Sequence, residues 1–442
     1  MSISLSDHFT YPRILRFVLP SIVMMLFTSI YTIVDGFFVS NCVGKNAFAA
    51  LNLIFPALTL LSAFGFMFGT GGSAYIAKLL GEGERRRADN VFSLLIAALM
   101  LVGLIVAVSA FILMRPIALL LGATPLIVDD CVLYGRVLIS VTPFFVLQIS
   151  FQSFLVAAER PKLGLLITLL SGAVNMVLDF LLVYLLPFGL AGAAAATALS
   201  QTVGGLVPLI YFLCGKNELL HIVPPRLDKH ALLHSCGNGA SEMVSNLSMS
   251  LVSILYNFQL MKLAAEDGIS AYGIIMYVSF IFMAFFIGFS MGVTPIVGYH
   301  YGAGNAAEIK NMLCKGLVIN AAASVTMTVL SVLLALPIAR LFVGYDAALC
   351  AMTANALRIY ALSYLLCGFN IFASAFFTGL NNGPVSALIS FLRTFVIQAA
   401  AVILLPLWLG INGIWLAITA AEGVTLAVSV ILLLQNRKKY GY

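Results

Sequence analysis

Long apolar stretches, separated by short polar breaks, occupy most of the chain and constrain its fold more than any other feature. Of the 442 residues, 62% are hydrophobic and 9% are charged, whereas a soluble domain carries roughly a quarter charged residues. The stretches are long enough for spanning helices, which need about 20 residues, and far longer than the roughly ten-residue strands of a membrane barrel. We predict an all-α polytopic membrane protein with twelve transmembrane helices in two six-helix pseudo-symmetric bundles. The predicted helices lie near residues 14–38, 50–77, 91–114, 132–157, 163–186, 190–213, 238–262, 270–298, 315–340, 355–379, 385–406 and 412–435.

The distribution of Lys and Arg predicts the orientation of these helices. With a cytoplasmic N-terminus, the inner side carries 16 basic residues and the outer side six, which is the asymmetry that the positive-inside rule requires. We expect a multi-pass protein of the bacterial inner (plasma) membrane with both termini in the cytoplasm. The net charge of +6 is then a topology signal, and Arg85–Arg87 is interpreted as a loop anchor, so no nucleic-acid partner is expected. The inner set is Arg13, Arg16, Lys78, Arg85, Arg86, Arg87, Arg160, Lys162, Lys216, Arg226, Lys229, Lys310, Lys315, Arg437, Lys438 and Lys439, and the outer set is Lys45, Arg115, Arg136, Lys262, Arg340 and Arg358.

An internal repeat divides the chain into two halves. The glycines of Gly65–Gly69 recur as Gly288–Gly292 at an offset of 223, and Gly81 recurs as Gly302 at an offset of 221. Six helices per half give both halves the same orientation, so the repeat axis should lie along the membrane normal, with a site between or within the halves. We predict an N-terminal six-helix bundle at 1–213, a cytoplasmic linker at 214–236 and a C-terminal six-helix bundle at 237–442.

Two aspartates fall inside predicted spans, Asp35 in the first and Asp179 in the fifth. Each costs on the order of 2.5–3.5 kcal/mol on insertion scales, so each needs a reason. Both belong to polar stripes, which are sets of polar residues spaced so that they lie on one face of a helix. A third stripe occupies the sixth span. All three stripes must face protein or water, and all three reach the outer half of the membrane. The stripes are Thr28, Tyr31, Thr32 and Asp35; Ser171, Asn175 and Asp179; and Thr197, Ser200, Gln201 and Gly204.

The chemistry of these stripes leaves three interpretations open. Carboxylate, amide and hydroxyl oxygens are ligands that suit Na⁺, and two close carboxylates could instead share a proton. Hydrogen bonds that only pack the helices are the third interpretation. Pro20 lies 15 residues before Asp35 inside the same span, where a proline permits a helix bend that would move the stripe.

The second half does not repeat the acids, because Asp35 corresponds to Asn257 and Asp179 to Val402. Arg393 and Glu422 are intramembrane residues on successive predicted helices, interpreted as an internal ion pair or as residues that handle substrate or ion. Glu242, near the inner start of its span, is interpreted as an interfacial residue, with a ligand role as the alternative.

The seven cysteines show no paired metal-ligand spacing, and the five histidines fall near inner loops or the tail. We therefore expect no cofactor other than a coupling ion, H⁺ or Na⁺. An intramembrane enzyme would need a nucleophile, a metal or a histidine cluster on its spans, and none is visible, so we predict that the chain is not an enzyme.

Several motifs resemble the multidrug and toxic compound extrusion (MATE) family, in its bacterial DinF-like and MepA-like branch. They are the run Ile30-Tyr31-Thr32-Ile33-Val34-Asp35 leading to Gly44, Ala47, Ala49 and Ala50, the run Asn175-Met176-Val177-Leu178-Asp179, and the segment from Gly189 to Ser200. The resemblance extends from Pro20 to about residue 435 and implies a secondary antiporter that expels cationic, often aromatic, compounds in exchange for Na⁺ or H⁺.

The resemblance also implies a cation or proton coupling site in the first half. The family's site matches Asp35, Asn175, Asp179 and Thr197, with Tyr31 beside it and Pro20 as the helix bend. Some relatives carry a further acid deep in helix seven and another in helix ten. This chain has only the shallow Glu242 in the former and no acid in the latter, so a second-half ion site is not expected.

The alternative function is a flippase for lipid-linked saccharides or peptidoglycan precursors of the same superfamily. Such a protein should line its cavity with basic residues that meet pyrophosphate, whereas Arg393 is the one basic residue clearly inside a predicted span. The 32 Phe, 16 Tyr and 16 Met instead suit lipophilic cationic small molecules, which bind through adaptable packing and cation–π contacts. We expect such substrates, a lipid bilayer around the protein, and a monomer.

Overall fold

The computed structural model describes residues 3–43 and 45–442, and the side chains within these ranges apart from those at positions 32, 33, 36, 37, 40, 41, 45, 46, 48, 49, 52, 55, 56, 59 and 266. This described part is almost entirely helical and contains no β-strand. The first half comprises α1 (Tyr11–Phe38), η1 (Val39–Val43), α2 (Lys45–Gly81), α3 (Arg85–Leu120), α4 (Val128–Ser140), α5 (Thr142–Ala157), α6 (Pro161–Asp179), η2 (Phe180–Leu185) and α7 (Gly189–Leu213), where η denotes a π-helical turn.

The connecting segment carries α8 (Lys229–Asn238). The second half comprises α9 (Ala240–Gly302), α10 (Ala306–Val343), α11 (Ala347–Ala361), α12 (Tyr364–Gly379), α13 (Gly383–Phe391), η3 (Leu392–Val396), α14 (Ile397–Leu404), α15 (Pro406–Leu409) and α16 (Ile411–Tyr440).

The twelve predicted spans all have a counterpart among these helices. In the described residues, nine helices are long and apolar enough to cross a membrane, and α4–α5 and α11–α12 each form one further span bent by 59° and 45°. The remaining span is residues 240–264, because α9 contains two helices joined at Ala265, whose φ of 49° is not helical. The prediction of an all-α protein with twelve transmembrane helices is therefore confirmed.

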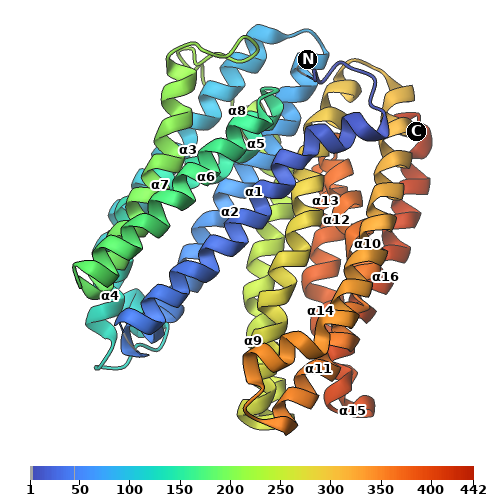
Figure 1. The fold of residues 1–442 in the computed structure, drawn as a ribbon. Coiled ribbons are helices and arrows are strands. Elements are labelled where there is room, and N and C mark those ends of the chain that lie inside the picture. The colour runs from blue at the N-terminus through green and yellow to red at the C-terminus, as the bar shows by residue number, and fades with distance from the viewer. Residues whose placement is uncertain (1–2, 44) are drawn as a thin grey trace.

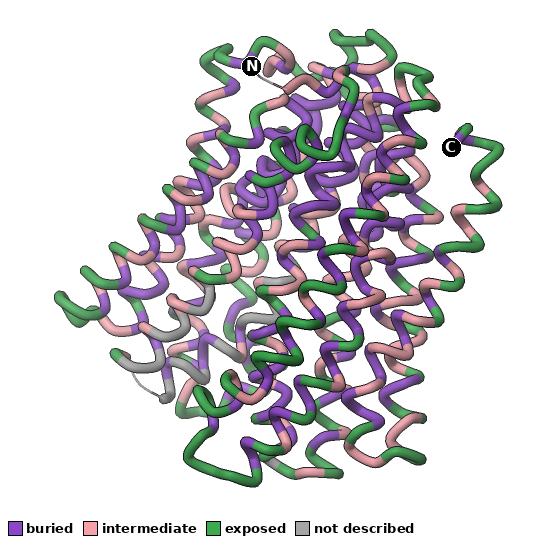
Figure 2. Tube along the Cα trace, turned by 45° about the vertical axis from the view of Figure 1, so that its right-hand side comes forward, coloured by how far each residue is buried: buried purple, intermediate pink, exposed green. Residues whose placement is uncertain are grey.

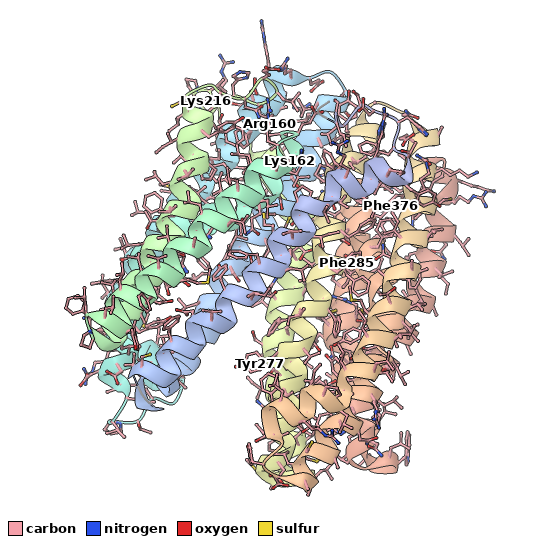
Figure 3. All side chains as sticks on the ribbon, in the orientation of Figure 1. Arg160, Lys162, Lys216, Tyr277, Phe285 and Phe376 are labelled. Carbon is pink, nitrogen blue, oxygen red and sulfur yellow. The ribbon has the colours of Figure 1, made fainter. Side chains whose placement is uncertain are left out.

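The helices form two bundles, α1–α7 and α9–α16, which meet at the end that carries α8 and both termini and diverge toward the opposite end (Figure 1). The buried backbone stretches are concentrated toward the end where the bundles meet (Figure 2). One apolar cluster there combines Ala77 and Val156 of the first bundle with Phe289 and Phe372 of the second. Arg160, Lys162 and Lys216, three of the basic residues predicted for the inner side, lie at this same end (Figure 3).

Two glycines show how the repeat forms the contact between α2 and α9. A Cβ added at Gly81 would overlap the carbonyl oxygen of Tyr299, and a Cβ added at Gly302 would overlap the carbonyl oxygen of Lys78. Both glycines and both carbonyls are separated by the repeat offset of 221 residues. The two contacts are therefore repeat-related copies of one helix crossing, and only glycine lets the backbones approach so closely.

Candidate functional site

Three helices of the first bundle bring the predicted polar residues together. The hydroxyl of Thr197 on α7 donates a hydrogen bond of 3.4 Å to Asp35 Oδ1 on α1. The amide of Asn175 on α6 donates to Thr197 Oγ1, also at 3.4 Å. The first contact joins positions 162 residues apart and the second joins positions 22 residues apart, so the three stripes form one cluster between α1, α6 and α7.

The carboxyl groups of Asp35 and Asp179 face each other within this cluster. The side chain of Asp179 is 0% exposed, and neither of its carboxylate oxygens has a hydrogen-bond donor within the described part of the chain. A carboxylate is an acceptor only, so a hydrogen bond between these two groups requires a proton on one of them. Asp35 is partly buried, and an acid pair that faces inward in this way needs either a shared proton or a bound cation to offset its desolvation and repulsion.

The other residues predicted for this site lie on α1, and a π-helical turn follows Asp179. Tyr31, one helical turn before Asp35, is partly buried and its ring contacts Phe27 at a centroid distance of 6.1 Å. Pro20 is buried inside α1. The side chain of Thr32, the fourth member of the α1 stripe, lies outside the described residues. Asp179 ends α6, and the chain continues as the π-helical turn η2, a wider helix that often occurs at functional sites.

Tyr134 is a site residue that the sequence analysis missed. It lies on α4, is 3% exposed and is close to Thr197 and both aspartates. No polar stripe accompanies it along the fourth predicted span. A lone tyrosine in a span that otherwise has no acid was the only available signal.

A chain of hydrogen bonds extends the cluster away from the acid pair along α6. Ser171 Oγ donates to the Ser200 carbonyl at 2.8 Å, and Gln148 Nε2 on α5 donates to Ser171 Oγ at 3.0 Å. Gly204 makes room for Gln148, because a Cβ at that position would fall against the amide group. Next to Gln148, a cavity of about 10 Å³ reaches Gln152 and Thr168, which is room for a single water.

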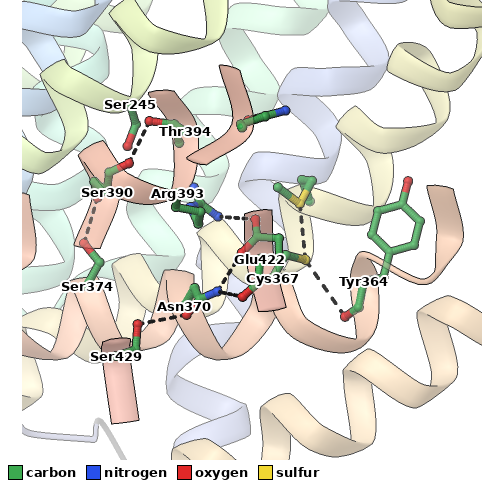
Figure 4. Close-up of polar contacts among 12 residues, drawn as sticks. Ser245, Tyr364, Cys367, Asn370, Ser374, Ser390, Arg393, Thr394, Glu422 and Ser429 are labelled. Atoms are coloured by element: carbon green, nitrogen blue, oxygen red, sulfur yellow. Dashed lines mark hydrogen bonds and ion pairs between the residues drawn. The ribbon is translucent and has the colours of Figure 1, made fainter. Parts of the chain in front are cut away.

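The second bundle contains a different polar cluster (Figure 4). Arg393 Nη1 on η3 lies 3.4 Å from Glu422 Oε1 on α16, and Glu422 is 3% exposed. Asn370 on α12 donates to Glu422 Oε2 at 2.7 Å and accepts a 2.8 Å hydrogen bond from Ser429. Glu242, which the sequence placed at the membrane interface, lies within the electrostatic reach of Arg393. This cluster thus holds one base and two acids.

Comparison with known proteins gives the family. The MatE family model matches residues 20–181 and 243–404, one copy in each half. The chain is 26% identical over 436 residues to the multidrug export protein MepA of Staphylococcus haemolyticus, covering 97% of this chain and 94% of that protein. It is 24% identical over 437 residues to MepA of Staphylococcus aureus, with the same coverage.

Solved structures agree on the fold. A crystal structure of MATE in complex with MaL6 superposes with a TM-score of 0.93 at 23% identity, covering 98% of both chains. An outward-facing multidrug resistance MATE family transporter gives 0.91 at 23% identity, covering 97% of this chain and 96% of that one. A Pyrococcus furiosus transporter described as having a binding pocket of reverse polarity gives 0.91 at 22% identity, covering 98% of both chains. The matched family model covers both bundles and the relatives span almost the whole chain, so this protein belongs to the MatE family of multidrug efflux transporters.

Proposed function

We propose that this protein is a secondary active antiporter that exports lipophilic cationic compounds in exchange for H⁺ or Na⁺ by alternating access. The observation that carries the proposal is the pair formed by Asp35, which is partly buried, and Asp179, which is fully buried. No basic side chain acts on this pair among the described residues, so its negative charge is available to an exchangeable ion.

The coupling site consists of Asp35, Asn175, Asp179 and Thr197, with Tyr31 beside it. Loading it with H⁺ or Na⁺ neutralises charge inside a low-dielectric bundle, where Coulomb interactions are strong. A cationic substrate nearby would lose attraction at the same time. Ion and drug therefore oppose each other, which is the linkage that an antiporter needs.

The proposal includes the two halves as moving units. The bundles 1–213 and 237–442, connected by the linker 214–236, would rock about their glycine-packed contact while Pro20 allows α1 to bend. The end with α8 and both termini would face the cytoplasm of a bacterial cell, because the basic residues of the inner set gather there. The working unit would be a monomer.

The flippase alternative receives no support from the intramembrane charges. A pyrophosphate head group needs positive charge that is not already neutralised, and Arg393 faces the carboxylates of Glu422 and Glu242. An acid-rich interior favours cations over anionic lipid carriers.

The test is ethidium export by the reconstituted protein, or ethidium uptake into everted membrane vesicles, with a proton gradient and a Na⁺ gradient imposed separately. We expect efflux with one gradient and its loss when that gradient is collapsed. Efflux that is equal with and without both gradients, or transport of an anionic lipid-linked pyrophosphate in preference to any cation, would refute the antiport proposal.

A further inference from the structure

The segment before α1 crosses from one bundle to the other. It begins above the first bundle, runs to the second bundle, and the chain then turns back as α1 (Figure 1). We propose that this N-terminal strap, residues 3–10, is a latch that holds the end bearing the termini closed, and that it releases the first bundle at Glu159 when that end opens. The proposal rests on the alternating access proposed above and adds a gate to it.

The strap is attached to the second bundle through Glu308, in the first turn of α10. His8 Nδ1 lies 2.7 Å from Glu308 Oε2, and the Phe9 amide donates to Glu308 Oε1 at 2.9 Å. The Phe9 carbonyl accepts hydrogen bonds from Lys315 at 2.7 Å and Asn311 at 2.9 Å. Both carboxylate oxygens and two further side chains of α10 thus hold this end of the strap.

At the Ser4 and Leu5 end, the strap is attached to the first bundle through one carboxylate oxygen. Ser4 Oγ and the Leu5 amide both donate to Glu159 Oε1, each at 2.6 Å. Glu159 lies in the turn between α5 and α6 with a φ of +58°, a conformation in which glutamate is uncommon. The repeat-related turn in the second half has Asn381 at a φ of +55°, and asparagine adopts this conformation more readily. A glutamate at a position suited to asparagine indicates that its longer, charged side chain has a use, and binding the strap is what that side chain does.

Two apolar side chains of the strap are buried where the two bundles meet. Leu5 and Phe9 are both 0% exposed and belong to the apolar cluster that combines residues of the two bundles. Separation of the bundles at this end must therefore break one of the two attachments and expose apolar surface. The Glu159 attachment is the weaker, because two donors share one oxygen there, whereas both carboxylate oxygens of Glu308 and the side chains of Lys315 and Asn311 hold the other end.

Hydrogen–deuterium exchange of the full-length protein in nanodiscs tests the latch without any transport. We expect Glu159→Gln to speed exchange at the Leu5 amide by at least about fivefold, since it weakens a charge-assisted hydrogen bond, and to leave the Phe9 amide protected. Ser4→Ala, which removes one of the two donors and leaves the carboxylate in place, should give a smaller change in the same direction. Glu218→Gln, at an exposed acid of the same end, is the matched control and should leave both amides as in the wild type.

A second measurement links the latch to the gate. In everted vesicles, Glu159→Gln should raise the apparent affinity for ethidium offered from the cytoplasmic side several-fold, because the open form becomes more populated. Unchanged exchange at Leu5 in Glu159→Gln, or equal acceleration at Leu5 and Phe9, would overturn the latch even if the wild type pumps normally. A wild type that does not respond to either gradient, with Leu5 exchange still dependent on Glu159, would instead refute the antiport proposal and leave the strap attachment standing.

Discussion

The two halves share a helical plan but hold opposite kinds of polar cluster. In the first half, Asp35 and Asp179 face each other without a basic partner among the described residues, and Asn175 and Thr197 supply only neutral groups. In the second half, Arg393 pairs with Glu422 and acts electrostatically on Glu242. Within the described residues, the first cluster has no basic side chain as a counter-ion, whereas the second has the guanidinium of Arg393. Duplication therefore preserved the packing while the chemistry of the two halves diverged.

Neutralising the acid pair should have the largest effect. We expect Asp35→Asn or Asp179→Asn to abolish gradient-driven efflux at unchanged expression, because amide and carboxylate have nearly the same shape but only the carboxylate holds an exchangeable charge. Initial efflux rates in vesicles measure this. The control is Asp129→Asn, at a side chain that is 81% exposed and pairs with Arg115 outside the acid pair. If both Asp35 and Asp179 variants pumped at the wild-type rate, the coupling role of the first half would be wrong.

Mutations in the second-half cluster should change the free energy of unfolding. Removing one partner of a buried ion pair costs roughly 3–5 kcal/mol, and removing both is much less costly. We expect Arg393→Met to lower the thermal midpoint most, since it leaves Glu242 and Glu422 without a counter-charge. Glu422→Gln should cost less, because Glu242 still faces Arg393.

The double variant Arg393→Met/Glu422→Gln should recover part of that loss in the same thermal unfolding assay. A double variant that loses the sum of the two single effects would show that the groups are not coupled. The exposed Arg115–Asp129 pair, with side chains 59% and 81% exposed, supplies the comparison, since its neutralisation should change stability little.

The affinity for a lipophilic cation should depend on the acids of the first-half cluster and not on those of the second-half cluster. If ion and drug compete, lipophilic cation affinity should rise with pH, because deprotonation restores negative charge, or should fall as Na⁺ is added at fixed ionic strength. Couplings of this kind are typically about 5–150-fold. Purified protein and a fluorescent cation are sufficient for the titration. The dependence should vanish in Asp35→Asn and persist in Glu422→Gln; affinity that stays flat in both titrations of the wild type would contradict antiport.

The smallest effect is expected at Tyr134. Tyr134→Phe removes a buried hydroxyl close to Thr197 and the two aspartates, and a polar contact of this kind is worth about 1 kcal/mol net. The apparent affinity for the coupling ion should weaken by roughly fivefold while maximal efflux is maintained. Tyr184→Phe, at a side chain that is 61% exposed, is the matched control. Identical ion dependence in the two variants would remove Tyr134 from the site.

Much of the architecture could be predicted from residue type and spacing. Twelve apolar stretches predicted the spans because hydrocarbon admits only helices or closed barrels, and the glycine offsets predicted the duplication. The stripe containing Asn175 and Asp179 predicted which face of α6 avoids lipid. Tyr134 and Gln148 were missed, since neither stands in a stripe and each reaches the cluster from a helix whose rotation the sequence does not report.

The sequence by itself determined the helices, their repeat and the polar face that each one turns away from lipid, because these properties depend on the order of residues along one helix. Only the tertiary structure decided which faces meet. It placed Asp179 against Asp35, brought Glu242 into the field of Arg393, and stretched residues 3–10 between Glu159 and Glu308. The physical reason is that helical periodicity determines only the direction in which a side chain points from its own helix axis. A charged side chain is stabilised by the groups on the neighbouring helix that faces it. Which helix that is depends on the packing of segments far apart in the chain.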